Sequence, residues 1–235
     1  MDSWENLNYD PENNGEEFVL KVLSRFNFQC IFDVGASTGK WTLMAARYFP
    51  GAKIHCFEIA PETLMELKKS IQRNQQIVIN EFGLLDQNQT INIKYYPDEK
   101  GKSSIYDYPH QFKSESVQGK VMRGDSYIQD YRIDLVNFLK IDTEGSEYLV
   151  LKGFAQSLQE KKIEIIQFEY GKLNIIAGFL LYNFYELLSS YDYVVGKIYP
   201  NYVDFRDYDF KHEDFRGPNF LAVHKDREDI IKALN

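Results

Sequence analysis

The chain has 235 residues, of which 44% are hydrophobic and 15% aromatic, and its formal net charge is −8. These values predict one large domain with a substantial core, and the negative charge argues against nucleic acid as the main partner. The longest apolar stretch, Ile175–Tyr182, is too short for membrane insertion, and the first residues lack a signal-peptide pattern. Because two cysteines make no disulfide framework, we expect a cytoplasmic protein, and we leave its oligomeric state open.

Helical and strand-like apolar patterns alternate along most of the sequence. Residues 1–15 are polar and are expected to be a flexible lead-in to a single domain over residues 16–235. The polar stretch 97–120 is expected to be a mobile loop. In chain order the apolar spacing predicts helices over Glu16–Phe26, Trp41–Tyr48, Pro61–Arg73, Glu147–Leu158 and Phe179–Leu188. It predicts strands over Cys30–Val34, Lys53–Phe57, Gln76–Glu81, Thr90–Tyr95, Leu135–Ile141, Ile163–Phe168, Tyr193–Ile198 and Phe220–His224.

This alternation is typical of an α/β fold with a mostly parallel central sheet and helices on both faces. In such folds a ligand binds outside the carboxyl ends of the strands. Acidic residues stand at or directly after the ends of four predicted strands, namely Asp33, Glu58, Asp142 and Glu169. We therefore expect these four carboxyl groups to lie near a ligand.

The loop after the first strand reads DVGASTG over residues 33–39. Its glycines, Gly35 and Gly39, are one residue too close for a phosphate-binding P-loop, and Ser37 breaks the dinucleotide fingerprint. The loop fits D-x-G-x-x-x-G, the first motif of class I S-adenosylmethionine-dependent methyltransferases. That cofactor has no phosphate, so the loop needs neither a lysine nor a metal.

The same loop suggests how the cofactor would be held. We expect Gly35 and Gly39 to let the backbone approach it closely, and Asp33 to accept a hydrogen bond from its ammonium group, directly or through water. Backbone N–H groups at the start of the next helix would receive its carboxylate. Glu58, after the second strand, is placed to bind both ribose hydroxyls.

The segment Leu135–Phe154, LVNFLKIDTEGSEYLVLKGF, closely resembles the KIDxEGxExxVLKG signature of the FkbM-type methyltransferases. Shorter segments at Phe57-Glu58, 80–86, 101–105, 163–169 and 219–222 resemble other family motifs in the same order, although Ile59 replaces the proline of the family's FEP. The resemblance implies a Rossmann-like class I methyltransferase, usually acting on a hydroxyl of a sugar or another small metabolite. It adds Phe57, Phe82, Ser37 and Asp142 to the candidate cofactor residues.

An alcohol must lose its proton as it attacks the methyl group, and a carboxylate can accept that proton. Asp142 is our first candidate for this base and Glu169 the second, with Lys140 and Glu144 as flanking candidates for catalysis. Asp142 and Glu169 are also suitable ligands for Mg²⁺, which gives a metal-dependent alternative. N-methylation of a small amine and a non-catalytic, methyltransferase-like binding protein are the other functions left open.

Overall fold

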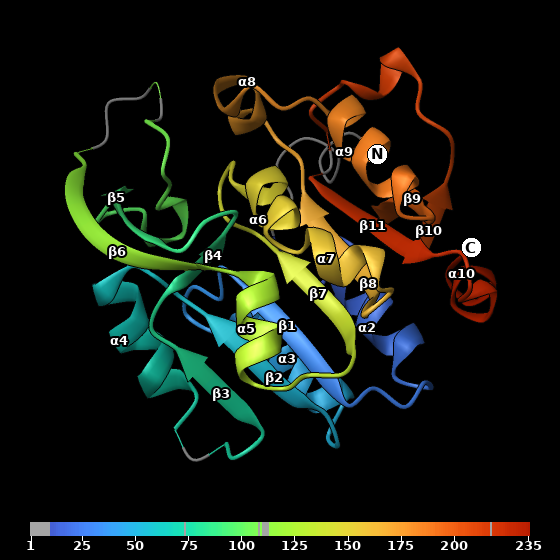
Figure 1. Cartoon of the computed structure of the whole chain (residues 1–235), viewed down its shortest axis with the longest axis horizontal. Helices are drawn as coiled ribbons and strands as arrows, with labels where there is room; N and C mark the ends of the chain where they lie inside the picture. The colour runs from blue at the N-terminus through green and yellow to red at the C-terminus, as the bar shows by residue number, and fades with distance from the viewer. Residues whose placement is uncertain (1–9, 73, 108, 110–112, 217) are drawn as a thin grey trace.

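The centre of the molecule is a mixed sheet, seen in a computed structural model in which we describe residues 10–72, 74–107, 109, 113–216 and 218–235 (Figure 1). Within these residues the sheet has eight strands in the order β10-β9-β11-β8-β7-β1-β2-β3. The strands are β1 (Cys30–Val34), β2 (Lys53–Phe57), β3 (Ile77–Asn80), β7 (Val136–Ile141), β8 (Ile163–Glu169), β9 (Tyr193–Tyr199), β10 (Tyr202–Phe205) and β11 (Asn219–His224). From β3 to β8 neighbouring strands are parallel, and β11 pairs antiparallel with both β8 and β9. This confirms the expected α/β class.

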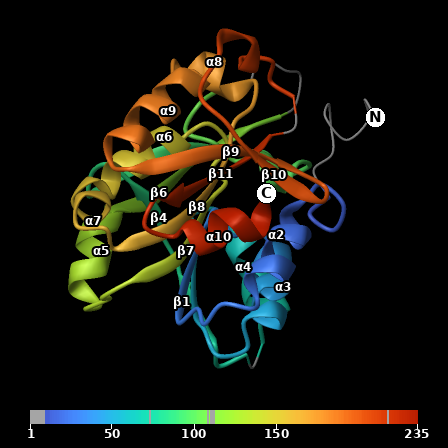
Figure 2. The ribbon, with the colours of Figure 1, turned by 90° about the vertical axis from the view of Figure 1, so that its right-hand side faces the viewer.

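Helices cover both faces of this sheet (Figure 2). One face carries α2 (Glu16–Leu23), α3 (Lys40–Tyr48), α4 (Pro61–Ser70) and α10 (Glu228–Leu234). The other carries α5 (Gly124–Asp130), α6 (Glu147–Gly153), α7 (Ala155–Gln159) and α9 (Leu181–Ser190), and α8 (Leu173–Ala177) follows β8. Every residue of β1 and β7 is buried, because side chains of each strand alternate between two covered faces.

A small second sheet lies beside the carboxyl ends of the central strands (Figure 1). It consists of β4 (Gly83–Leu85), β6 (Glu115–Arg123) and β5 (Gln89–Tyr95) in that order, with β6 parallel to β4 and antiparallel to β5. The expectation of a loop throughout 97–120 is therefore wrong for residues 115–120, which belong to β6. Short 3₁₀ turns at η1 (Lys100–Lys102) and η2 (Phe210–His212) complete the elements. Residues 108 and 110–112 of the expected loop lie outside the described residues.

Other boundaries differ from the expected ones in ways that packing explains. The helix expected over Glu147–Leu158 is interrupted at Phe154, whose side chain is fully buried beneath Gly124 of α5. Of the expected lead-in, residues 1–9 lie outside the described residues, whereas Asn14 and Gly15 are buried, so chain packing begins before α2. No helix in the described part of the chain combines the length and the apolar character needed to cross a bilayer.

Candidate active site

A cleft opens at the carboxyl ends of β1, β2 and β7, where the loops after these strands face the small sheet. It is lined by apolar side chains together with a few polar and acidic groups, the combination that is usual for small-molecule sites. Its lining includes Gly35, Ser37, Phe57, Glu58, Ile59, Leu84, Ser104, Ile105, Val121, Asp142 and Glu144. The cleft is thus where the fold class predicts a ligand.

Glu58 stands on one wall of the cleft and is held by backbone groups from two loops. Its Oε1 accepts hydrogen bonds from the N–H groups of Ile59 and Ala60, at 2.9 and 2.7 Å, and its Oε2 accepts from Ser37 N at 2.9 Å. Burial raises the pKa of the Glu58 carboxyl, and the backbone N–H groups act in the opposite direction. Because a carboxylate has about four acceptor positions, these three bonds leave capacity for a ligand hydroxyl.

The charged side chains in the described lining of the cleft are all acidic. Its described lining contains the carboxyl groups of Glu58, Asp142 and Glu144 but no lysine or arginine. Phosphate groups in protein sites are usually held by Arg, Lys or metal ions in addition to backbone N–H groups. The cleft therefore suits a neutral or cationic ligand better than a nucleotide phosphate.

Both glycines of the first loop have left-handed backbones, and protein atoms occupy the space where a Cβ would be. Gly35 has φ +83°, and a Cβ there would lie 1.8 Å from the carbonyl oxygen of Asp142. Gly39 has φ +88° and caps α3, and a Cβ there would meet Leu67 of α4 and Ile71, which follows that helix. The missing Cβ atoms therefore permit close packing of the protein on itself, and Gly39 does not line the cleft.

Asp33 and Lys140 face each other across β1 and β7, beneath the cleft and on the α3 side. The Asp33 side chain is fully buried, its Oδ2 accepts a 2.6 Å hydrogen bond from Thr42 Oγ1, and its Oδ1 lies 3.7 Å from Lys140 Nζ. Neither residue lines the cleft. The structure therefore favours positioning roles for both, and direct contact of Asp33 with a cofactor stays a prediction.

Lys140 links the buried Asp33 to Asp142, which lines the cleft. Its Nζ donates to Asp142 Oδ2 at 2.9 Å, while the Asp142 side chain is 40% exposed. Burial alone would lower the pKa of Lys140, but the charges of Asp142, Asp33 and Glu16 outweigh it and hold the pKa above its ordinary value. Lys140 is therefore a fixed cation that orients Asp142.

Asp142 and Glu169 form a hydrogen-bonded carboxyl pair. Burial would raise the pKa of Asp142, yet the Lys140 ammonium and the bond from Glu169 bring it below its ordinary value. The pKa of Glu169 is raised well above its ordinary value by burial and by the charges of Asp142 and Glu144. The pair thus favours an ionised Asp142 and a protonated Glu169.

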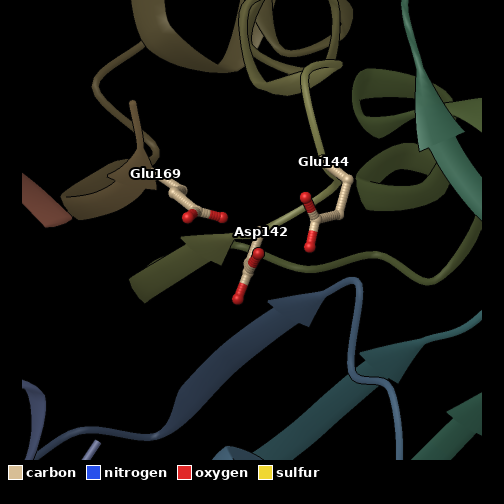
Figure 3. A group of neighbouring side chains, drawn as sticks. All are labelled: Asp142, Glu144 and Glu169. Carbon is tan, nitrogen blue, oxygen red and sulfur yellow. The ribbon is translucent and has the colours of Figure 1, made fainter. Parts of the chain in front are cut away.

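Glu144 completes the acidic group, and Figure 3 shows the carboxyl groups of Asp142, Glu144 and Glu169 converging. One carboxylate oxygen of each lies within 4.8 Å of the others, so the trio could hold a metal ion. The loop that presents Glu144 is fixed from below by Glu147, which is buried and accepts from Thr143 N and Gly145 N at 2.8 and 3.0 Å. Glu147 is thus a structural residue of this loop.

The structure brings together part of the set of residues predicted for the site. Gly35, Ser37, Phe57, Glu58, Asp142 and Glu144 line the cleft, whereas Phe82 packs against Phe57 and does not line it, and the roles predicted for these residues stay predictions. The apolar wall formed by Ile59, Leu84 and Val121, and the roof formed by Ser104 and Ile105, were not among the predicted site residues. The GKSSI segment at 101–105, already noted as a family motif, could have indicated the roof.

Comparisons of sequence and fold with known proteins find similar methyltransferases. Methyltransferase 1 of Beauveria bassiana is 28% identical over 142 residues, covering 52% of this chain and 57% of its own length. Hexuronic acid methyltransferase AglP of Haloferax volcanii is 26% identical over 161 residues, covering 67% of this chain and 64% of its own. The matches to these two relatives therefore span between half and two thirds of their lengths.

The solved structure of methyltransferase FkbM from Methylobacillus flagellatus aligns with a TM-score of 0.51 at 19% identity, covering 83% of this chain and 44% of that one, and so has the same fold. Residues 33–195, more than half of the chain, match the profile described as the methyltransferase FkbM domain. The chain therefore belongs to the methyltransferase FkbM family.

Proposed function

We propose that the chain is an S-adenosylmethionine-dependent methyltransferase that methylates a hydroxyl group on a sugar or another small metabolite. The observation that carries this proposal is the cleft itself. Its described lining has carboxyl groups but no lysine or arginine, Glu58 stands on one wall, and the Asp142–Glu169 carboxyl pair lies at its edge. The cofactor, when bound, supplies a methyl group on a positively charged sulfur.

The residues of the cleft fit this cofactor. The remaining acceptor capacity of Glu58 suits one ribose hydroxyl, and Ile59, Leu84 and Val121 offer an apolar wall for a purine. The carboxyl groups suit a sulfonium and an ammonium group. The first turn of α3, whose N-cap Gly39 has no side-chain cap, suits the cofactor's carboxylate.

On the acceptor side, Asp142 is the proton acceptor. Lys140 holds its Oδ2, which fixes the carboxylate at the edge of the cleft and keeps it ionised at neutral pH. As a hydroxyl attacks, its proton passes to Asp142, and the hydrogen bond with Glu169 stabilises the ionised carboxylate before transfer. Orientation of the hydroxyl at the methyl group supplies the rest of the rate increase.

The three carboxyl groups of Asp142, Glu144 and Glu169 help to judge two alternatives, N-methylation of an amine and metal-dependent methylation of a hydroxyl. Three neighbouring carboxyl groups would attract an amine acceptor but would also favour its protonated form, which has no lone pair for attack, so we favour a hydroxyl acceptor. A divalent cation bound by Asp142, Glu144 and Glu169 would act by orienting and acidifying the hydroxyl. The carboxyl pair provides a proton acceptor without it.

Calorimetry followed by an acceptor screen tests the proposal. We expect adenosylhomocysteine to bind and NAD and ATP not to bind comparably, and labelled adenosylmethionine to transfer its methyl group to a sugar-like alcohol. Binding of adenosylhomocysteine without transfer to any alcohol or amine would favour the non-catalytic alternative. Failure of adenosylhomocysteine to bind would contradict the proposal.

A further inference from the structure

We propose that Ser104 is a positioning residue through which occupancy of the cofactor cleft fixes the acceptor loop, Asp142–Glu147. The inference rests on the proposed function, because it assigns a consequence to cofactor binding. It concerns the roof segment, Gly101–Tyr106, several of whose residues line the cleft.

The roof segment is joined to the small sheet by backbone pairing. Ser104 forms an isolated bridge with Lys94 of β5, with Lys94 N donating to Ser104 O at 2.7 Å and Ser104 N donating to Lys94 O at 3.1 Å. The flanking Ile105 packs with the buried cluster of Ala60, Ile93 and Tyr95. A ligand in the cleft would therefore contact a segment whose position depends on one short bridge and on apolar packing.

The hydroxyl of Ser104 joins this roof to the acceptor loop. Ser104 is 3% exposed, and its Oγ donates a 2.6 Å hydrogen bond to the carbonyl oxygen of Glu144 while it accepts one from Tyr106 N at 3.0 Å. The ring of Tyr106 covers Gly145, where a Cβ would lie 3.2 Å from it. The roof segment thus contacts the acceptor loop at Glu144 and at Gly145.

Glu144 needs such support because its backbone is in the left-handed region, at φ +53°. Residues other than glycine rarely adopt this conformation unless their surroundings hold them in it. Glu147 holds the neighbouring N–H groups of Thr143 and Gly145, and Ser104 holds the carbonyl of Glu144. In this conformation the Glu144 carboxylate points toward Asp142 and Glu169 (Figure 3). A cofactor that restricts the roof segment would therefore, through Ser104, also restrict the position of Glu144.

Hydrogen exchange with and without saturating adenosylhomocysteine tests this coupling without any knowledge of the acceptor. In the wild type we expect the ligand to slow exchange in peptides covering residues 142–147. In Ser104→Ala, with adenosylhomocysteine raised until calorimetry shows that this variant is saturated, the slowing at 142–147 should shrink by about 2- to 10-fold, the effect of losing one neutral hydrogen bond. Ser104→Thr, which keeps the hydroxyl, should restore the slowing.

Ser116→Ala is the matched control, because Ser116 is an exposed serine of β6 that lies opposite Lys94 in the same small sheet. It should behave as the wild type. A purely structural role of Ser104 would speed exchange equally in free and bound protein, and the ligand-dependent difference would persist. That persistence, or a wild type that binds the ligand without slowing at 142–147, would overturn the coupling. Absence of ligand binding in the wild type would instead overturn the proposed function, and the coupling with it.

Discussion

The carboxyl groups of Asp142 and Glu169 share a hydrogen bond at the ends of the adjacent parallel strands β7 and β8, yet their pKa values are shifted in opposite directions. The ammonium group of Lys140 contacts Asp142 Oδ2 and lowers the pKa of Asp142 only. Two neighbouring acids are thereby given different protonation states at one pH. Lys140 thus favours an ionised Asp142, while burial and the charges of Asp142 and Glu144 favour a protonated Glu169.

Asp142→Asn keeps the shape of the side chain and removes its charge, so we expect kcat to fall by about 10²–10⁴. Affinity for adenosylhomocysteine should change little. Glu169→Gln is the matched variant, because the amide resembles the protonated acid and should retain most of the activity. Methyl-transfer kinetics and calorimetry measure both, and near-normal turnover in Asp142→Asn would leave orientation alone as the source of catalysis.

Glu58→Gln should weaken adenosylhomocysteine binding by roughly 1.5–3 kcal/mol, because a charge-assisted hydrogen bond to the ribose is lost. Calorimetry measures this change, and a thermal melt of the free variant shows whether the Ser37 and Ala60 contacts survive. Glu81→Gln is a suitable control, since Glu81 follows the next strand and pairs on the surface with Lys68. Equal affinity in Glu58→Gln and wild type would remove the ribose assignment.

Stability should depend on pH through Glu147, which is 1% exposed and whose pKa burial raises from 4.5 to about 7. Between these values the native state binds more protons than the unfolded state, so the stabilising contribution is complete below pH 4.5 and is lost as the pH rises through 7. Relative to Glu147→Gln, the wild type should lose about 3 kcal/mol of unfolding free energy across this window. Urea unfolding at several pH values measures it, and a constant difference between the two proteins would contradict it.

Gly35→Ala should destabilise the protein by about 2–5 kcal/mol, through its left-handed backbone and a clash with the Asp142 carbonyl. Gly51→Ala provides the comparison, because a Cβ at Gly51 meets no atom within 4 Å. That variant should stay within about 1 kcal/mol of wild type. Denaturant unfolding of both variants checks the expectation, which fails if Gly35→Ala is as stable as Gly51→Ala.

EDTA should leave methyl transfer nearly unchanged, because in the proposed mechanism Asp142, held by Lys140 and paired with Glu169, accepts the proton without a metal ion. The measurement is initial rate before and after exhaustive chelation, with Mg²⁺ added back. A large loss that Mg²⁺ reverses would assign Asp142, Glu144 and Glu169 to a metal site and would overturn the metal-free version of the mechanism.

The central parallel sheet could be predicted because its strands are buried on both faces and appear as continuous apolar runs, as in Leu135–Ile141. Of the small sheet, only β5 was predicted, as the strand expected over Thr90–Tyr95. Its strand β6, ESVQGKVMR, is mostly exposed and polar, and β4 has three residues, so neither produces a clear apolar pattern. Their pairing depends on contacts with distant segments, which periodicity does not detect.

The site divides in the same way. Glu58 and Asp142 follow predicted strands, and their place at the sheet edge follows from topology. Asp33 was expected at the ligand, but all five residues of β1 are buried, so the pattern does not tell which side of the strand meets the cleft. Ser104 is placed at the site by its bridge to Lys94, a tertiary contact that leaves no periodic pattern in the sequence.

The antiparallel direction of β11 has a consequence for how acceptor preference can change. Because Asn219 pairs with Glu169, the stretch before β11 runs past the acceptor edge, where Pro218 O accepts from Tyr170 N and Glu213 caps α9. The described part of this stretch, residues 206–216 and 218, lies beyond the span 33–195 that matches the family. We therefore expect substitutions in this stretch to change the surroundings of Glu169 and α9 while the loops after β1 and β2 stay intact, so that the acceptor side of the proposed site can vary separately from its cofactor side.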